Sequence, residues 1–218
     1  MKTFALITEG ITDQAFLQVI LEAYYGDDEE IDVTPLEPPR DATDESRQAE
    51  GGHGGWENVL EQCSIKEVVS DAISLNDYLI IQVDTDVCEE VNFNVSYRYD
   101  GRERTTHELI EAVKEKLVSK IDPEVYEKNK DKFIFAIAVH SLECWLLTAH
   151  GHTKSAKEKL VECEDQLRRS LGSKKIKYVK NYYSYISFSK EYRRKKDLMR
   201  YVEANISFKI FVESLPKN

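Results

Sequence analysis

The sequence predicts an α/β protein with a parallel, Rossmann-like sheet flanked by helices. Three short apolar runs have the length and composition of strands that are buried on both faces: TFALIT (3–8), YLIIQV (78–83) and FIFAIAV (133–139). Apolar residues spaced three or four positions apart, as in amphipathic helices, occur between and after these runs. Strands that alternate with helices in this way pair in parallel through right-handed crossovers.

The first half of the chain is expected to add an edge strand and a long loop. IDVTPLE (31–37) predicts a short strand, which Pro35 places at an edge because proline cannot donate to a neighbouring strand. The polar, glycine-rich segment 38–55 predicts a loop of a length that is usually functional or mobile. A helix over about 56–73 then leads into the second buried strand.

The second half of the chain is expected to be mostly helical. Residues 87–104 alternate in polarity around an Asp100-Gly101 turn, which is typical of a hairpin. An amphipathic helix is predicted over 106–121, with Thr106 as a candidate cap and Pro123 marking its end. Further helices are predicted directly after the third strand, over about 153–171 and 189–205, and in a short closing segment to Leu215.

Charge is distributed unevenly along the chain. The formal net charge is −10, yet the segment from Arg168 to Arg200 holds 12 Lys and Arg against 2 acids. Such a local excess is the electrostatic footprint of a polyanion-binding face, although a solvated helical surface paired with the acidic remainder explains it as well. We therefore expect a principal domain over 1–150 and a helical, basic extension packed on it over 151–218.

The composition predicts a soluble, cytoplasmic protein that does not enter a membrane. No apolar run approaches the roughly 18 residues of a membrane span. The first ten residues carry one Lys and a short apolar stretch that runs into Glu9, which makes a poor signal peptide. Four cysteines without CxxC spacing are expected to be reduced thiols rather than disulfide partners or zinc ligands: Cys63, Cys88, Cys144 and Cys163.

Acidic residues follow two of the predicted strands where each strand ends. Glu9 and Gly10 follow the first apolar run, with Asp13 four residues beyond Glu9, and Asp84 and Asp86 follow the second run. The carboxyl ends of parallel strands meet at one edge of a sheet, where ligands bind. Carboxylates gathered there repel one another unless a cation neutralises them, and hard oxygen ligands suit Mg²⁺ or Mn²⁺.

This combination resembles a Toprim domain, in which a strand ends in Glu-Gly, an acid follows four residues later and a later strand ends in Asp-x-Asp. TEGITDQAFLQVIL (8–21) is similar to the first motif of the nuclease branch, which includes the overcoming-lysogenization-defect nucleases. HSLECWLL (140–147) and ISFKIFVESL (206–215) resemble small standalone Toprim-like proteins, including RloB-like ones, found near prokaryotic defence and restriction loci. The resemblance covers residues 1–150.

The resemblance implies a divalent-metal-dependent nuclease with a possible role in antiviral defence. Glu9, Asp13, Asp84 and Asp86 would hold one or two Mg²⁺ or Mn²⁺ ions, because two-metal cleavage of a phosphodiester needs several carboxylates. Glu9, Asp84 and Asp86 would be the catalytic residues, with Glu9 also placed for proton transfer. The nuclease branch has a further acid and a lysine, for which the candidates are Glu143, Lys174, Lys175 and Lys177; His140 would support the site beside Glu143.

The basic segment also contains tyrosines, namely Tyr178, Tyr182, Tyr183, Tyr185 and Tyr192. Basic side chains can hold phosphates while aromatic rings stack on bases, which favours nucleic-acid binding. The alternative is an amphipathic surface whose tyrosines face the core. The side chains expected to contact the phosphate backbone are Lys174, Lys175, Lys177, Arg193, Arg194, Lys195 and Lys196.

Two other functional classes stay open at this point. A non-catalytic effector or binding subunit with the same fold would need a partner, such as an ATPase or a second copy of the chain. A phosphohydrolase or nucleotidyl transferase that uses the Asp84–Asp86 pair is disfavoured, because the haloacid-dehalogenase pattern needs such a pair on the first strand and Gly-Thr after it, whereas Val87-Cys88 follows here.

Overall fold

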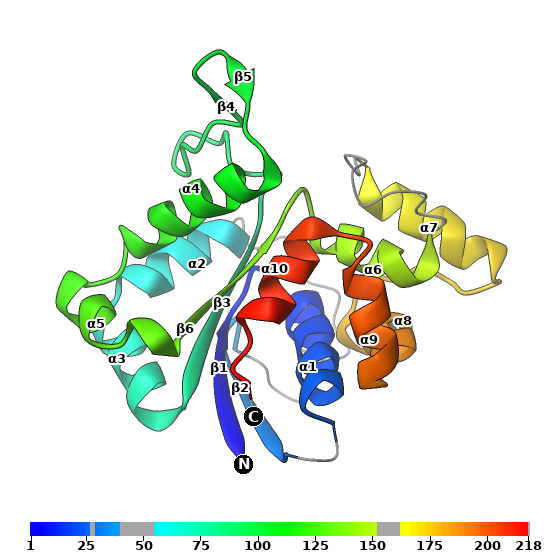
Figure 1. Ribbon diagram of the computed structural model, residues 1–218, viewed down its shortest axis with the longest axis horizontal. Coiled ribbons are helices and arrows are strands. Elements are labelled where there is room, and N and C mark those ends of the chain that lie inside the picture. The colour runs from blue at the N-terminus through cyan, green and yellow to red at the C-terminus, as the bar shows by residue number, and fades with distance from the viewer. Residues whose placement is uncertain (27–28, 40–54, 152–161, 218) are drawn as a thin grey trace.

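The computed structural model describes residues 1–26, 29–39, 55–151 and 162–217. Within them the chain is an α/β fold with a four-stranded sheet, all of whose strands are parallel, and helices on both faces (Figure 1). The predicted α/β class and parallel sheet are confirmed. The strand order is β2-β1-β3-β6, formed by β1 (Lys2–Ile7), β2 (Ile31–Glu37), β3 (Tyr78–Asp84) and β6 (Phe133–Ala138).

The two central strands are β1 and β3, which pair directly with Leu6 opposite Ile80. β3 pairs in turn with β6, so that Asp84 lies opposite Ala138 at the end of both strands. Pro35 lies in β2, an edge strand as predicted. This order brings the carboxyl ends of β1, β3 and β6 side by side at one edge of the sheet.

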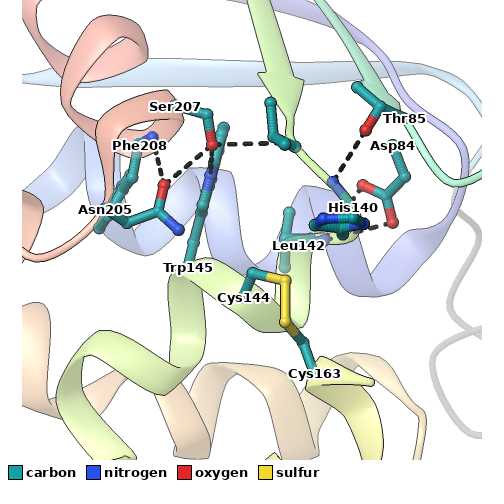
Figure 2. The surroundings of a disulfide bond; sticks show 11 residues. Asp84, Thr85, His140, Leu142, Cys144, Trp145, Cys163, Asn205, Ser207 and Phe208 are labelled. Atoms are coloured by element: carbon teal, nitrogen blue, oxygen red, sulfur yellow. Dashed lines mark hydrogen bonds between the residues drawn. A yellow bond between two sulfur atoms is a disulfide. The ribbon is translucent and has the colours of Figure 1, made fainter. Parts of the chain in front are cut away.

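One face of the sheet is covered by α1 (Ile11–Tyr25), α6 (Leu142–His150) and the C-terminal helices. Trp145 of α6 is fully buried here, and its indole Nε1–H donates to Ser207 Oγ at 2.8 Å (Figure 2). Its ring stacks on those of Phe208 and Phe211. These contacts fix α6 against the end of the chain. The other elements of this region are α7 (Cys163–Ser173), α8 (Tyr182–Phe188), the 3₁₀ turn η3 (Ser189–Tyr192), α9 (Lys195–Val202) and α10 (Ile206–Ser214).

The opposite face has its own apolar core, to which β3 contributes Leu79, Ile81 and Val83. Because successive residues of a strand point to opposite faces, the neighbouring Ile80 belongs to the other core. The helices that cover this face are α2 (Gly55–Ser64), α3 (Lys66–Leu75), α4 (Thr106–Val118) and α5 (Pro123–Lys128), and the 3₁₀ turn η2 (Lys130–Lys132) leads into β6.

Local differences from the sequence predictions have identifiable causes. The helix predicted over 56–73 is two helices, because Ile65 adopts an extended backbone and becomes the N-cap residue of α3. Thr105, not Thr106, caps α4, through a reciprocal capping box with Glu108. The predicted hairpin is present as β4 (Arg98–Tyr99) and β5 (Arg102–Glu103).

Two predictions fall partly outside the described residues. Residues 40–54 of the predicted long loop and 152–161 of the predicted 153–171 helix are not described, and α7 accounts for the end of the latter. The helix predicted over 189–205 is instead the 3₁₀ turn η3 followed by α9. Of the described helices, none has the length and apolar character needed to cross a bilayer.

The expectation that all four cysteines are reduced is wrong for one pair. Cys144 of α6 and Cys163 at the start of α7 form a disulfide, with their Cα atoms 5.0 Å apart (Figure 2). The two residues are 19 positions apart, and only the packing of α7 against α6 brings them together. Cys63 and Cys88 are free and buried, as expected.

Candidate functional site

Five acidic residues share one electrostatic environment at the carboxyl edge of the sheet. Asp84 is the last residue of β3, Glu9 lies just beyond β1, Asp13 is in the first turn of α1, and Asp86 follows β3 in a turn. Glu143 lies in the first turn of α6. The negative charges of the other four all act on Asp84. The four predicted metal ligands and Glu143, the predicted further acid, therefore lie within electrostatic range of one another at this edge.

Glu9 is held by backbone contacts from two sides. Its N–H donates to Gln82 Oε1 at 3.1 Å, and its carboxylate Oε1 accepts the N–H of Asp84 at 2.6 Å. Gly55, the first residue of α2, packs so closely that an added Cβ would lie 2.2 Å from the carbonyl oxygen of Glu9. Only glycine fits there without moving the loop that carries Glu9.

Asp84 joins β3 to the first turn of α6. Its two carboxylate oxygens lie 3.1 and 3.2 Å from the backbone nitrogen of Leu142, whose N–H they accept (Figure 2). Gln82, fully buried on the same strand, donates to Asp84 Oδ1 at 2.9 Å. A negative charge is favourable at the N-terminus of a helix, so α6 stabilises the ionised form of this side chain.

Lys180 supplies a positive charge to the cluster. It lies in the segment between α7 and α8, and its Nζ is 3.4 Å from Glu143 Oε1 and 3.6 Å from Glu164 Oε2. The hydroxyl of Tyr185 also donates to Glu143 Oε1, at 2.5 Å. The neighbouring carboxylates raise the pKa of Lys180 although burial opposes the shift, so this side chain stays protonated.

Burial and mutual repulsion disfavour the ionised carboxylates. Burial raises the pKa of Glu9 from 4.5 to about 8, with smaller contributions from the charges of Asp13 and Asp86. Burial, then the charge of Glu143, raises the pKa of Asp13 from 3.8 to about 7. The pKa of Asp84 is raised well above its ordinary value and that of Asp86 is also raised, in both cases first by burial.

Glu143 differs from its acidic neighbours. Burial acts to raise its pKa, but the charge of Lys180 and hydrogen bonds from Tyr185 and Ser141 outweigh burial and bring the pKa below its ordinary value. The ion pair of the cluster is thus formed by the buried Glu143 and the half-exposed Lys180. Asp13, Asp84 and Glu9 are left with an electrostatic penalty that a bound cation would relieve.

The donor chemistry fits a hard divalent cation, but the side chains are not yet arranged as ligands. Among the residues in the described ranges, no three Asp, Glu, His or Cys groups are placed to share one ion. The reason is visible in the hydrogen bonds, since Asp84 is engaged by Leu142 and Gln82 and Glu9 by the backbone of Asp84. Metal binding therefore requires Glu9 and its acidic neighbours to reorient.

Asp86 and His140 are linked through the backbone. The resemblance implies a strand that ends in Asp-x-Asp, but β3 ends at Asp84 and Asp86 is exposed in the following turn. The N–H of Asp86 donates to the carbonyl of His140 at 3.0 Å, and the N–H of His140 donates to Thr85 Oγ1 at 2.8 Å. His140 has φ 68°, a left-handed conformation, and its backbone positions the turn that carries Asp86.

The predicted nucleic-acid contacts divide into two groups. Lys177 lies in the same segment as Lys180, and both side chains line a cavity beside α7. The group on and before α9 lies elsewhere: Lys195 Nζ is 4.9 Å from the ring centroid of Tyr24, at the far end of α1 from Asp13. At about 1.5 Å rise per residue, the 11 positions between Asp13 and Tyr24 span about 16 Å. The structure does not bring Arg193, Arg194, Lys195 and Lys196 to the carboxylate cluster.

The remaining basic and aromatic candidates have structural partners. Lys174 Nζ lies 3.3 Å from Nδ1 of His150, and Lys175 is exposed. Of the tyrosines proposed to stack on bases, most pack inward, which favours the alternative of an amphipathic packing surface. The buried ones are Tyr182, Tyr185 and Tyr192, whereas Tyr183 is exposed.

The sequence reasoning missed three residues of the site. Lys180 lies in the predicted basic segment, but nothing in its spacing distinguishes it from Lys174 and Lys177. For Tyr185 the sequence predicts either base stacking or a place in the core, whereas its hydroxyl also donates a hydrogen bond to Glu143. Gln82 is a polar residue within a buried strand, which is costly unless its side chain is hydrogen-bonded, and that anomaly could have identified it.

Comparison with known proteins gives no relatives: no family model, curated protein or solved structure matches the chain. The function is therefore argued from the site itself.

Metal-free protein should lose stability as the pH rises from about 5 to 8. Over this range the folded state keeps protons on Asp13 and Glu9 that the unfolded state has released, so the free energy of unfolding falls with pH. In the presence of a chelator, the free energy of unfolding of Asp13→Asn should decrease less with pH than that of the wild type. The difference should be on the order of 2 kcal/mol over this range, measured by urea titration. The lowered pKa of His150 acts in the opposite direction, equally in both proteins. Parallel profiles for the two proteins would contradict the assignment.

Gly55→Ala should displace Glu9 and destabilise the fold, because the new methyl group overlaps the carbonyl of Glu9. We expect a loss of roughly 2 kcal/mol or more in urea titration. Gly172→Ala is the matched control: an added Cβ there meets no atom within 4 Å, and alanine gains up to about 1 kcal/mol over glycine in a helix. Equal stabilities for the two variants would show that the close approach at Glu9 is not maintained in solution.

Proposed function

We propose that the chain is a Toprim-like nuclease that depends on Mg²⁺ or Mn²⁺ and cleaves phosphodiester bonds in nucleic acid. The observation that carries the proposal is a group of five acids at adjacent strand ends, four of them buried or half-buried and the fifth, Asp86, exposed, accompanied by Lys180. Such a group destabilises a protein in the absence of a cation, so its presence favours a functional role.

The topology supports the Toprim-like assignment. Because β1 and β3 are neighbours in the order β2-β1-β3-β6, the Glu-Gly motif at Glu9 and the Asp-x-Asp motif at Asp84 share one edge of the sheet. The hydrogen bond from the Asp84 N–H to Glu9 joins the two motifs directly. These are the two motifs on which the sequence resemblance depends.

Several side chains have a chemical role in this proposal. Glu9, Asp13, Asp84 and Asp86 would hold the metal, which when bound would activate water and stabilise the leaving oxygen. Burial raises the pKa of Glu9 to about 8 in the metal-free protein, and a bound cation would lower it again, so Glu9 would be an ionised carboxylate that can accept a proton. The ammonium of Lys180 would stabilise negative charge on the phosphate, and Tyr185 would keep Glu143 in place beside that ammonium.

A second candidate is a non-catalytic effector or binding subunit that requires a partner, such as an ATPase or a second copy of the chain. The specific observation that favours it is the hydrogen bonding of Asp84 to Leu142 and Gln82, which gives that carboxylate a structural role without any metal. In this alternative the cluster would respond to binding of the partner rather than perform catalysis.

The cytoplasmic location and the defence context remain proposals. The defence context rests on the resemblance to proteins of defence loci. The Cys144–Cys163 disulfide argues against the cytoplasmic location, because cytoplasmic thiols are normally kept reduced.

The test of the proposal is metal-dependent cleavage by matched variants. Wild-type protein should cleave plasmid DNA, a single-stranded oligonucleotide or RNA in Mn²⁺ or Mg²⁺ and should not do so in chelator. Asp86→Asn should reduce the rate at least about 100-fold with little change in thermal stability, because the side chain is exposed. Asp100→Asn is the control, since it removes an exposed acid at a hairpin tip where φ is 50°, a conformation that asparagine also adopts.

The outcomes separate the two candidates. Full cleavage by Asp86→Asn would contradict the proposed site. Metal binding by the wild type without cleavage of any of the three substrates would favour the partner-dependent effector.

A further inference from the structure

A cavity of about 540 Å³ lies beside the carboxylate cluster. Its walls come from α7, through Glu164 and Arg168, and from the segment that joins α7 to α8, through Lys177, Tyr178 and Lys180. Lys180 belongs to both places, because it lines the cavity while its Nζ lies 3.4 Å from Glu143 Oε1. The cavity therefore opens next to the proposed site of cleavage.

The charge of the cavity is opposite to that of the protein as a whole. Arg168, Lys177 and Lys180 are the cations in its lining, and Glu164 is the acid. Glu164 is shared between two of the cations, at 2.9 Å from Arg168 and 3.6 Å from Lys180. A net positive lining within a chain of net charge −10 favours an anionic ligand.

The cavity offers charge rather than a surface for stacking. The ring of Tyr178 has the guanidinium of Arg168 5.1 Å from its centroid and is stacked on Phe188 at 5.8 Å. Its hydroxyl is hydrogen-bonded with that of Tyr185 at 2.9 Å. Since these contacts already occupy the aromatic ring, a nucleotide base has little to stack on here. A phosphate would find Lys177, which makes no ion pair among the described residues, beside the ion-paired Arg168 and Lys180.

We propose that this cavity is a phosphate subsite, which holds a backbone phosphate of the nucleic-acid strand next to the phosphodiester that is cleaved. The inference rests on the proposed nuclease function for the identity of the strand. Because Lys180 contacts both Glu143 and the cavity, a strand that follows this wall passes from the subsite directly to the carboxylates. Contacts to phosphates depend on the charge and spacing of the phosphate groups and not on the bases, so binding here is independent of base identity.

The experiment measures binding of a fluorescein-labelled oligothymidylate by anisotropy, in chelator and between about 50 and 200 mM NaCl. Lys177→Gln should weaken binding about threefold to tenfold and lower the slope of log K against log salt by about 0.7, because one phosphate contact is lost. Glu164→Gln should tighten binding of the oligonucleotide, because it removes the acid that pairs with Arg168 and Lys180. Lys120→Gln, which changes an exposed lysine just after α4 on the other face of the sheet, is the control and should change neither quantity.

The result that overturns the subsite is equal affinity and equal salt dependence for wild type, Lys177→Gln and Glu164→Gln, or no binding of the oligonucleotide by the wild type. Failure of the proposed function gives a different pattern. If the variants change binding as expected but the wild type cleaves nothing in Mn²⁺, the subsite stands and catalysis does not. If the wild type cleaves while all variants bind alike, catalysis stands and the subsite does not.

Discussion

The hydrogen bonds of Asp84 are the contacts on which the arrangement of the site depends. Its carboxylate accepts the N–H of Leu142 at the start of α6, and its own N–H donates to the carboxylate of Glu9. One residue at the end of β3 thereby fixes the loop after β1 and the helix after β6. The same residue is central to the electrostatics, because the four neighbouring acids all act on it. Structure and charge are therefore coupled, because a change in the hydrogen bonds of Asp84 would also change those of α6 and of Glu9.

The cluster is asymmetric in charge. Glu143, Lys180 and Tyr185 form a hydrogen-bonded and ion-paired group, in which an acid has a lowered pKa despite its burial. Glu9 and Asp13 lie on the other side with raised pKa values and make no ion pair among the described residues. This division suits the proposed site, in which Lys180 would contact a phosphate while the acids with raised pKa values would bind the metal.

Much of the sheet could be predicted because burial on both faces leaves an unambiguous apolar run at each strand. The convergence of Glu9 and Asp84 followed from parallel pairing alone, since it needs no knowledge of side-chain packing. Lys180 could not be chosen from among neighbouring lysines, because its position depends on an irregular segment between α7 and α8. The Cys144–Cys163 pair depends on the packing of two helices, and the burial of Tyr182 and Tyr185 depends on how α8 meets α1. The break at Ile65 carries no glycine or proline to mark it.

The most direct test of the central claim is crystallography of the protein with Mn²⁺, using anomalous scattering to locate the ion. The account predicts a peak in contact with oxygen atoms from at least three of Glu9, Asp13, Asp84 and Asp86, with Glu9 turned away from the N–H of Asp84. An anomalous map with no peak at this edge of the sheet, and with Glu9 and Asp84 keeping their metal-free hydrogen bonds at saturating Mn²⁺, would contradict it. The acids would then be structural, and the nuclease proposal would lose its basis.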